Sequence, residues 1–126
     1  MPHRPERLAE MIRDELTELI EGELADPRIG LATVSEVKLE PQMRIAHVYF
    51  AVSGNENEQV RTMEGLLAAR GFLRTELGHR LLLRRVPELR FELDRSREHT
   101  ARLDELLQRA RKRYAAMDRK KENLDA

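Results

Sequence analysis

The sequence predicts an α+β fold in which three strands form one sheet and helices pack on one of its faces. Apolar residues recur every three or four positions in several long stretches, which is typical of amphipathic helices. Three other stretches alternate apolar and polar residues, as strands with one buried face do. The order is helix, strand, strand, helix, kink, helix, strand, followed by a C-terminal helix. This order suits one layer of helices on a sheet.

The first helix is expected to run from Pro5 to the Asp26-Pro27 pair. Proline suits the first turn of a helix, and a residue that precedes proline is pushed out of the helical region. A turn at Ile29-Gly30 leads to the next element. The apolar stripe of this helix is Leu8, Ile12, Leu16, Leu19, Ile20 and Leu24.

Two strands should then pair as an antiparallel hairpin across a short loop. The first spans Leu31 to Glu40, and its alternation changes phase, which predicts a bulge near Ser35-Glu36. Pro41-Gln42 makes the turn. The second strand, Arg44 to Val52, has the cleanest alternation in the chain.

Two helices separated by an interruption follow the hairpin. Asn55 or Asn57 can cap the first of them. At Ala69-Arg70-Gly71 a lone glycine breaks the pattern, at a cost of about 1 kcal/mol relative to alanine, and we assign the kink to Gly71. The second helix is expected to end near Leu82, unless it is buried on a second side. The apolar stripes are Val60, Met63, Leu66 and Leu67 before the kink, and Leu73, Leu77 and Leu81 after it.

A third strand and a final helix complete the chain. Val86-Pro87 forces an extended approach to the strand, in which Leu89, Phe91 and Leu93 alternate with polar residues. Ser96 or Thr100 can cap the final helix, which continues into a basic tail from Arg109 to Lys121. We divide the chain into a domain at 1–95 and a C-terminal helix with its tail at 96–126. The stripe of the final helix is Leu103, Leu106, Leu107, Ala110, Tyr114 and Met117.

Composition and motifs favour a protein that is not an enzyme. The chain of 126 residues has no cysteine, which excludes disulfides and thiolate metal sites. Its four histidines lie in separate elements, and the spacing of Glu76 and His79 has no second copy, as a di-iron site would require. No nucleophile elbow or phosphate-binding loop is present. No apolar run approaches the roughly 20 residues of a membrane span. We therefore expect a cytoplasmic protein with no metal, no cofactor and no membrane contact.

Charge is unevenly distributed although its sum is zero. Residues 1–30 hold four arginines against eight acids, whereas 61–90 hold seven arginines against three acids. Residues 109–121 hold seven cations against Asp118 alone. A basic centre and tail favour an anionic partner, and arginine forks suit phosphates.

The order of the elements matches a type II K-homology domain, a module that clamps RNA with a Gly-x-x-Gly loop between two helices. Ala69-Arg70-Gly71 stands where this loop belongs, but the second glycine is missing. Few aromatic residues are available to stack on unpaired bases. We therefore expect helix ends and arginines to meet folded RNA by shape and charge.

Four ordered motifs resemble the bacterial ribosome-binding factor A family over about Arg4 to Leu107. In that family an Ala-x-Gly kink replaces the K-homology loop. The resemblance implies a non-catalytic factor that binds the immature small (30S) ribosomal subunit near the decoding region of its 16S rRNA. It also implies a role in late maturation of the rRNA ends and in growth in the cold. The motifs are Glu23-Leu24-Ala25-Asp26-Pro27-Arg28-Ile29-Gly30, Ala69-Arg70-Gly71-Phe72-Leu73-Arg74, Glu76-Leu77-Gly78-His79-Arg80-Leu81 and Arg85-Val86-Pro87-Glu88-Leu89-Arg90-Phe91.

We predict RNA contact around the kink and the hairpin, by a protein that acts as a monomer and does not bind DNA. The candidate residues are Ala69, Arg70, Gly71, Arg74, Arg80, Arg84 and Arg85, with Lys38 and Arg44 near the hairpin. Each arginine could instead belong to a solvated basic face. Two other functions stay open. One is a generic K-homology-like RNA binder. The other is an adaptor whose acidic first helix, with Glu15, Glu18, Glu21 and Glu23, meets a basic protein.

Overall fold

The computed structural model describes residues 5–24, 27–29, 32–94 and 101–125, and in the last helix the side chains of 103–116. Its sheet has the order β1-β2-β3, in which β1 (Ala32–Leu39) and β2 (Ile45–Val52) are antiparallel and β3 (Glu88–Leu93) is parallel to β2. The helices are α1 (Pro5–Gly22), α2 (Glu56–Ala68), α3 (Arg70–Leu81) and α4 (Ala101–Asp125), with a 3-10 turn η1 (Pro27–Ile29). The predicted α+β class and element order are confirmed.

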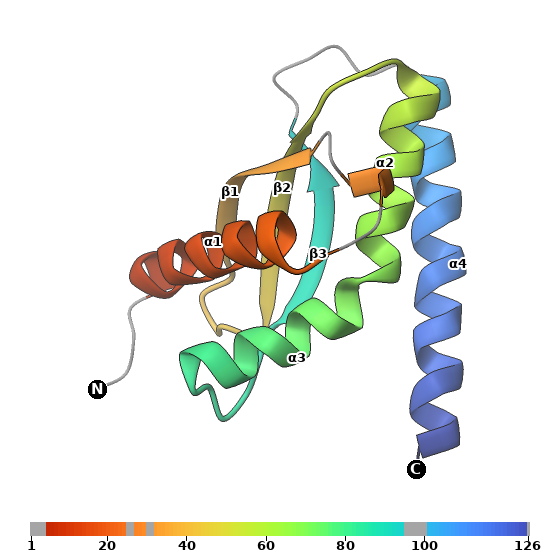
Figure 1. Cartoon of the computed structure of the whole chain (residues 1–126). Helices are drawn as coiled ribbons and strands as arrows, with labels where there is room; N and C mark the ends of the chain where they lie inside the picture. The colour runs from red at the N-terminus through yellow and green to blue at the C-terminus, as the bar shows by residue number, and fades with distance from the viewer. Residues whose placement is uncertain (1–4, 25–26, 30–31, 95–100, 126) are drawn as a thin grey trace.

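One face of the sheet forms the core with the helices (Figure 1). Helix α1 crosses in front of the strands, and α4 runs beside α2. At the centre of the core, Phe50 and Phe91 from adjacent strands pack edge to face with ring centres 5.1 Å apart. The alternate residues of β2, such as His47 and Tyr49, are only half-buried because no described helix covers that face. The strand residues of the buried face are Ala32, Val37, Ala46, Val48, Phe50, Val52, Leu89, Phe91 and Leu93.

Helix α1 is shorter than predicted, because it ends at Gly22 rather than at Asp26-Pro27. The N–H of Glu23 still donates to the carbonyl of Leu19 at 2.9 Å, which closes the last turn. Glycine is a poor helix former and marks the stop. Asp26 lies outside the described residues, and Pro27 opens η1, whose Ile29 is buried.

The predicted bulge, cap and helix end are confirmed. The pairing of β1 with β2 shifts between Val34 and Glu36. Of the two candidate caps, Asn55 caps α2: its side-chain oxygen accepts the N–H of Glu58 at 2.8 Å, and the Glu58 carboxylate accepts the N–H of Asn55 at 3.1 Å. Helix α3 ends at Leu81, and its C-cap Leu82 has a left-handed conformation with φ of 52°.

Helix α4 packs along α2 and extends the core. Leu103, Leu107 and Ala110 are buried there, and an ion pair joins Arg113 to Glu64 of α2. The predicted caps Ser96 and Thr100, and the proposed boundary after residue 95, lie outside the described residues. The basic segment runs within α4, so its described part continues a packed helix.

Candidate nucleic-acid interface

The joint between α2 and α3 lies at Ala69, which ends one helix and starts the next with φ of −89° and ψ of −1°. Its N–H donates to the carbonyls of Gly65 at 3.2 Å and Leu66 at 3.1 Å, and its carbonyl accepts the N–H of Leu73 at 2.9 Å. The chain therefore changes direction (Figure 1) while hydrogen bonding continues on both sides of the bend.

The assignment of the kink to Gly71 is wrong, because Gly71 is the second residue of α3. It does not have the positive φ that would require glycine; among the described residues only Met43, Gly54 and Leu82 do. A Cβ added at Gly71 would meet no atom within 4 Å. The bend uses dihedral angles that any L-residue reaches at Ala69, so it needs no glycine.

Arg70 and Arg74 lie one turn apart on the same side of α3. The guanidinium of Arg74 donates to the carbonyls of Val86 at 3.0 Å and Pro87 at 3.3 Å. These bonds tether the loop of residues 82–87 to α3. Arg74 therefore has a structural role. A phosphate could bind only those N–H groups of its guanidinium that do not already bond to these two carbonyls.

The tethered loop brings further predicted residues to the same end of the sheet. Arg84 and Arg85 are exposed within it, and at its far end the N–H of Glu88 donates to the carbonyl of Arg44 at 2.8 Å. No carboxylate of the described residues pairs with Arg44, Arg84 or Arg85. These side chains therefore present positive charge to solvent. We refer to the group as the arginine cluster: Arg44, Arg70, Arg74, Arg84 and Arg85.

Arg80 lies apart from the arginine cluster, against α1. Its guanidinium is 3.4 Å from the carboxylate of Glu15 and 3.5 Å from that of Glu18, and it also pairs with Glu23. Three carboxylates around one cation leave the site with net negative charge, so it does not attract phosphate. The four ion-paired residues join α3 to the end of α1.

Lys38 also lies apart, on the sheet face that the helices leave open. Its ammonium is 5.8 Å from the centre of the Tyr49 ring. On the same face, Nδ1 of His47 lies 3.1 Å from a carboxylate oxygen of Glu92. This face mixes both signs of charge, in contrast to the arginine cluster.

The sequence does not show which distant carboxylate pairs with a given cation. Arg113 of the basic segment pairs with Glu64, which is 49 residues earlier. Arg109 pairs with Glu105 on its own helix at 2.7 Å, as the spacing of four allows. Lys112 is exposed and pairs with no described carboxylate. Part of the basic segment thus stabilises α4 and its packing on α2.

The described part of the chain contains neither a metal-binding group of side chains nor a membrane-spanning helix. No group of three or more His, Asp or Glu side chains there could hold a metal ion. No helix in the same residues combines the length and the apolar character required to cross a bilayer.

Comparison with known proteins places the chain in a family. Residues 4–107 match the family model described as ribosome-binding factor A. This chain belongs to the ribosome-binding factor A family. A ribosome-binding factor A from Koribacter versatilis is 50% identical over 113 residues, which cover 90% of this chain and 92% of the relative.

Solved structures of family members share the fold. The crystal structure of ribosome-binding factor A from Thermus thermophilus superposes with a TM-score of 0.65 at 29% identity, covering 75% of this chain and 99% of that one. A homology model of the Thermus thermophilus protein, fitted into a cryo-EM map of its complex with the 30S subunit, has a TM-score of 0.60 at 30% identity. It covers 75% of this chain and 99% of that chain.

Proposed function

We propose that this member of the ribosome-binding factor A family is a non-catalytic assembly factor in the cytoplasm. It binds the immature 30S subunit through its 16S rRNA, assists late maturation and processing of that rRNA, and supports growth in the cold. The observation that carries the proposal is family membership over nearly the whole domain. The Thermus thermophilus relative that was fitted into the map of a 30S complex supports the choice of partner.

The arginine cluster supports a phosphate-binding role along α3, from its start at Arg70 to the loop that follows it. Ala69 has no polar side chain to cap α3. The start of this helix therefore suits a phosphate oxygen better than the start of a helix with a side-chain cap would. Arg70 begins the helix, and Arg84 and Arg85 extend from a loop that Arg74 fixes in place. A fixed loop loses little conformational entropy when it binds, which favours recognition of a folded RNA surface.

Within this proposal the predicted residues do not contribute equally. Arg84 and Arg85 are the primary phosphate contacts, because they are adjacent in one loop, both are exposed, and no described carboxylate neutralises them. Arg80 and Lys38 contribute less, since one is held by α1 and the other lies on the open sheet face.

The test compares two double variants that lose the same charge. Arg84→Gln/Arg85→Gln removes the primary contacts, and Arg7→Gln/Arg13→Gln removes two exposed arginines of α1. Binding to purified free 30S subunits is measured by sedimentation at several salt concentrations. The slope of log affinity against log salt should fall by about 0.7–0.9 for each lost phosphate contact. An equal slope for the two double variants would refute the assignment.

Comparing the binding of the protein to free 30S subunits with its binding to other partners separates the alternative functions. A generic RNA binder would bind naked RNA and mature ribosomes as well as free 30S subunits, whereas an adaptor protein would stay bound after ribonuclease treatment. The adaptor is less supported, because three of its four predicted acids already surround Arg80.

The maturation role is tested in cells that lack the gene. Precursor 16S rRNA should accumulate, most strongly at low temperature, and the wild-type gene should remove it. The Arg84→Gln/Arg85→Gln gene should rescue poorly. Normal rRNA ends and normal growth in the cold would contradict this part of the proposal.

A further inference from the structure

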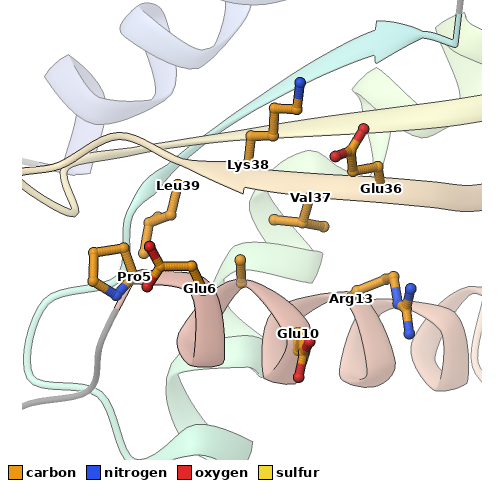
Figure 2. Close-up of a pocket in the computed structure, with 9 residues that line it drawn as sticks. Pro5, Glu6, Glu10, Arg13, Glu36, Val37, Lys38 and Leu39 are labelled. Carbon is orange, nitrogen blue, oxygen red and sulfur yellow. The ribbon is translucent and has the colours of Figure 1, made fainter.

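A groove of about 480 Å³ lies between α1 and β1 (Figure 2). Strand β1 is an outer strand of the sheet, since among the residues that the structure describes it pairs only with β2. Val37 and Leu39 point from β1 toward the helix, where Pro5 and Ala9 line the opposite wall. The groove therefore combines an apolar lining with the unpaired side of a strand.

The backbone groups of β1 alternate in direction along this groove. The N–H of Glu40 donates to the carbonyl of Ile45 at 3.0 Å, which makes these two residues a hydrogen-bonded pair. Hydrogen-bonded pairs of an antiparallel ladder occur at every second residue. In the observed register Lys38 and Glu36 therefore also bond to β2, whereas Val37 and Leu39 direct their N–H and C=O groups outward.

The wall of the groove formed by α1 carries acidic residues. Glu6 and Glu10 are exposed there, and the one cation of this wall, Arg13, lies 3.6 Å from Asp14. Lys38 points away from α1, toward the open face of the sheet (Figure 2). The groove thus favours a cationic occupant and disfavours RNA.

The shape of β1 limits what can pair with it. The bulge at Ser35 interrupts the ladder, so the regular stretch that faces the groove runs only from Glu36 to Glu40. A second copy of this chain, paired edge to edge, would bring Glu6 and Glu10 of both α1 helices together. Like charges in proximity oppose that arrangement.

We propose that this groove binds a short, extended, lysine- and arginine-rich segment of a partner protein, which adds to β1 as a fourth strand. The backbone of the segment bonds to Val37 and Leu39, as in other cases of strand addition. Its side chains opposite Val37 and Leu39 point toward α1, so lysines at those positions cover Leu39 and Pro5 with their apolar stems and extend their ammonium groups to Glu6 and Glu10. The groove lies on the side of the sheet away from β3 and contains neither Arg84 nor Arg85, so this inference does not rest on the function proposed above.

The test uses the full chain labelled with ¹⁵N and three capped seven-residue peptides. One alternates lysine and valine, one alternates glutamate and valine, and one alternates valine with lysine that is methylated at its backbone nitrogen, so that the lysines opposite Val37 and Leu39 have no N–H to donate. Binding is followed by NMR and by amide hydrogen exchange. The lysine–valine peptide should slow exchange at Val37 and Leu39 and leave the rates at Glu36 and Lys38 unchanged.

Charge variants on α1 provide the matched control. Glu10→Lys reverses a charge in the groove, and Glu21→Lys reverses an exposed charge elsewhere on the same helix. Glu10→Lys should weaken binding of the lysine–valine peptide by about twofold to tenfold, and Glu21→Lys should leave it within twofold.

Other outcomes overturn the proposal. They are no binding of the lysine–valine peptide at millimolar concentration, equal binding of either other peptide, or protection that does not alternate along β1. Protection that rises with protein concentration alone would identify a second copy as the occupant. Displacement of the peptide by a short oligoribonucleotide would identify RNA.

Discussion

Replacing Gly71 by alanine tests where the bend between α2 and α3 originates. A helix is less stable with glycine than with alanine at the same position by about 0.5–1 kcal/mol, because glycine loses more backbone freedom on folding. A Cβ at Gly71 would meet no atom within 4 Å, so no steric cost offsets this gain. We therefore expect Gly71→Ala to raise the free energy of unfolding by about 0.5–1 kcal/mol.

Gly78→Ala provides the contrast within the same helix. A Cβ there would lie 2.7 Å from Cγ2 of Val86, the residue whose carbonyl accepts from Arg74. Overpacking of this kind costs about 1–3 kcal/mol, so the second variant should be less stable than the wild type. Both values come from urea unfolding followed by circular dichroism. A loss of stability in Gly71→Ala would refute the placement of the bend at Ala69.

Gly71→Ala also tests RNA contact, in a separate measurement of binding. Gly71 lies at the start of α3, where the proposed function places a phosphate. If rRNA backbone approaches this position closely, the added methyl group should lower 30S affinity although the protein is more stable. Unchanged affinity would restrict the contact to side chains of the arginine cluster.

Three further changes test local interactions by urea unfolding. Asn55→Ala should cost about 1 kcal/mol by removing the cap of α2, and Asn57→Ala, its neighbour without a cap role, should be close to neutral. Arg74→Lys keeps the charge but loses the fork that holds two carbonyls, so it should cost about 1 kcal/mol and speed amide exchange in the 82–87 loop. Phe91→Ala should cost about 3–5 kcal/mol, because its ring is 2% exposed and packs on another phenylalanine, and the urea midpoint should fall accordingly.

Local patterns predicted most of the fold. The phase change that predicted a bulge at Ser35-Glu36 is a property of neighbouring residues, and so is the end of the helix that was predicted near Leu82. The position of the bend could not be predicted from neighbouring residues. Near the bend, the glycine in close contact with another element is Gly65, where an added Cβ would lie 3.1 Å from Cγ1 of Ile29. That approach depends on η1, which is far away in the sequence.

The candidate site was less predictable, because a cation does not reveal its partner in the sequence. Arg80 and its carboxylate partner Glu23 are 57 residues apart. Arg74 finds its acceptors in backbone carbonyls, which every residue possesses. Charge counting therefore located the basic region but could not separate structural arginines from those that face solvent.

This separation changes the expected strength of RNA binding. Of the seven arginines at 61–90, Arg74 holds a loop, Arg80 meets three carboxylates and Arg90 lies 3.7 Å from Glu88. If all seven contacted phosphates, this region alone would contribute a salt slope of about 5–6. With Arg84 and Arg85 as the primary contacts, it should contribute about 1.4–1.8. Such a weak electrostatic contribution makes affinity depend on the fit of a folded rRNA surface, which favours a subunit in one maturation state over RNA in general.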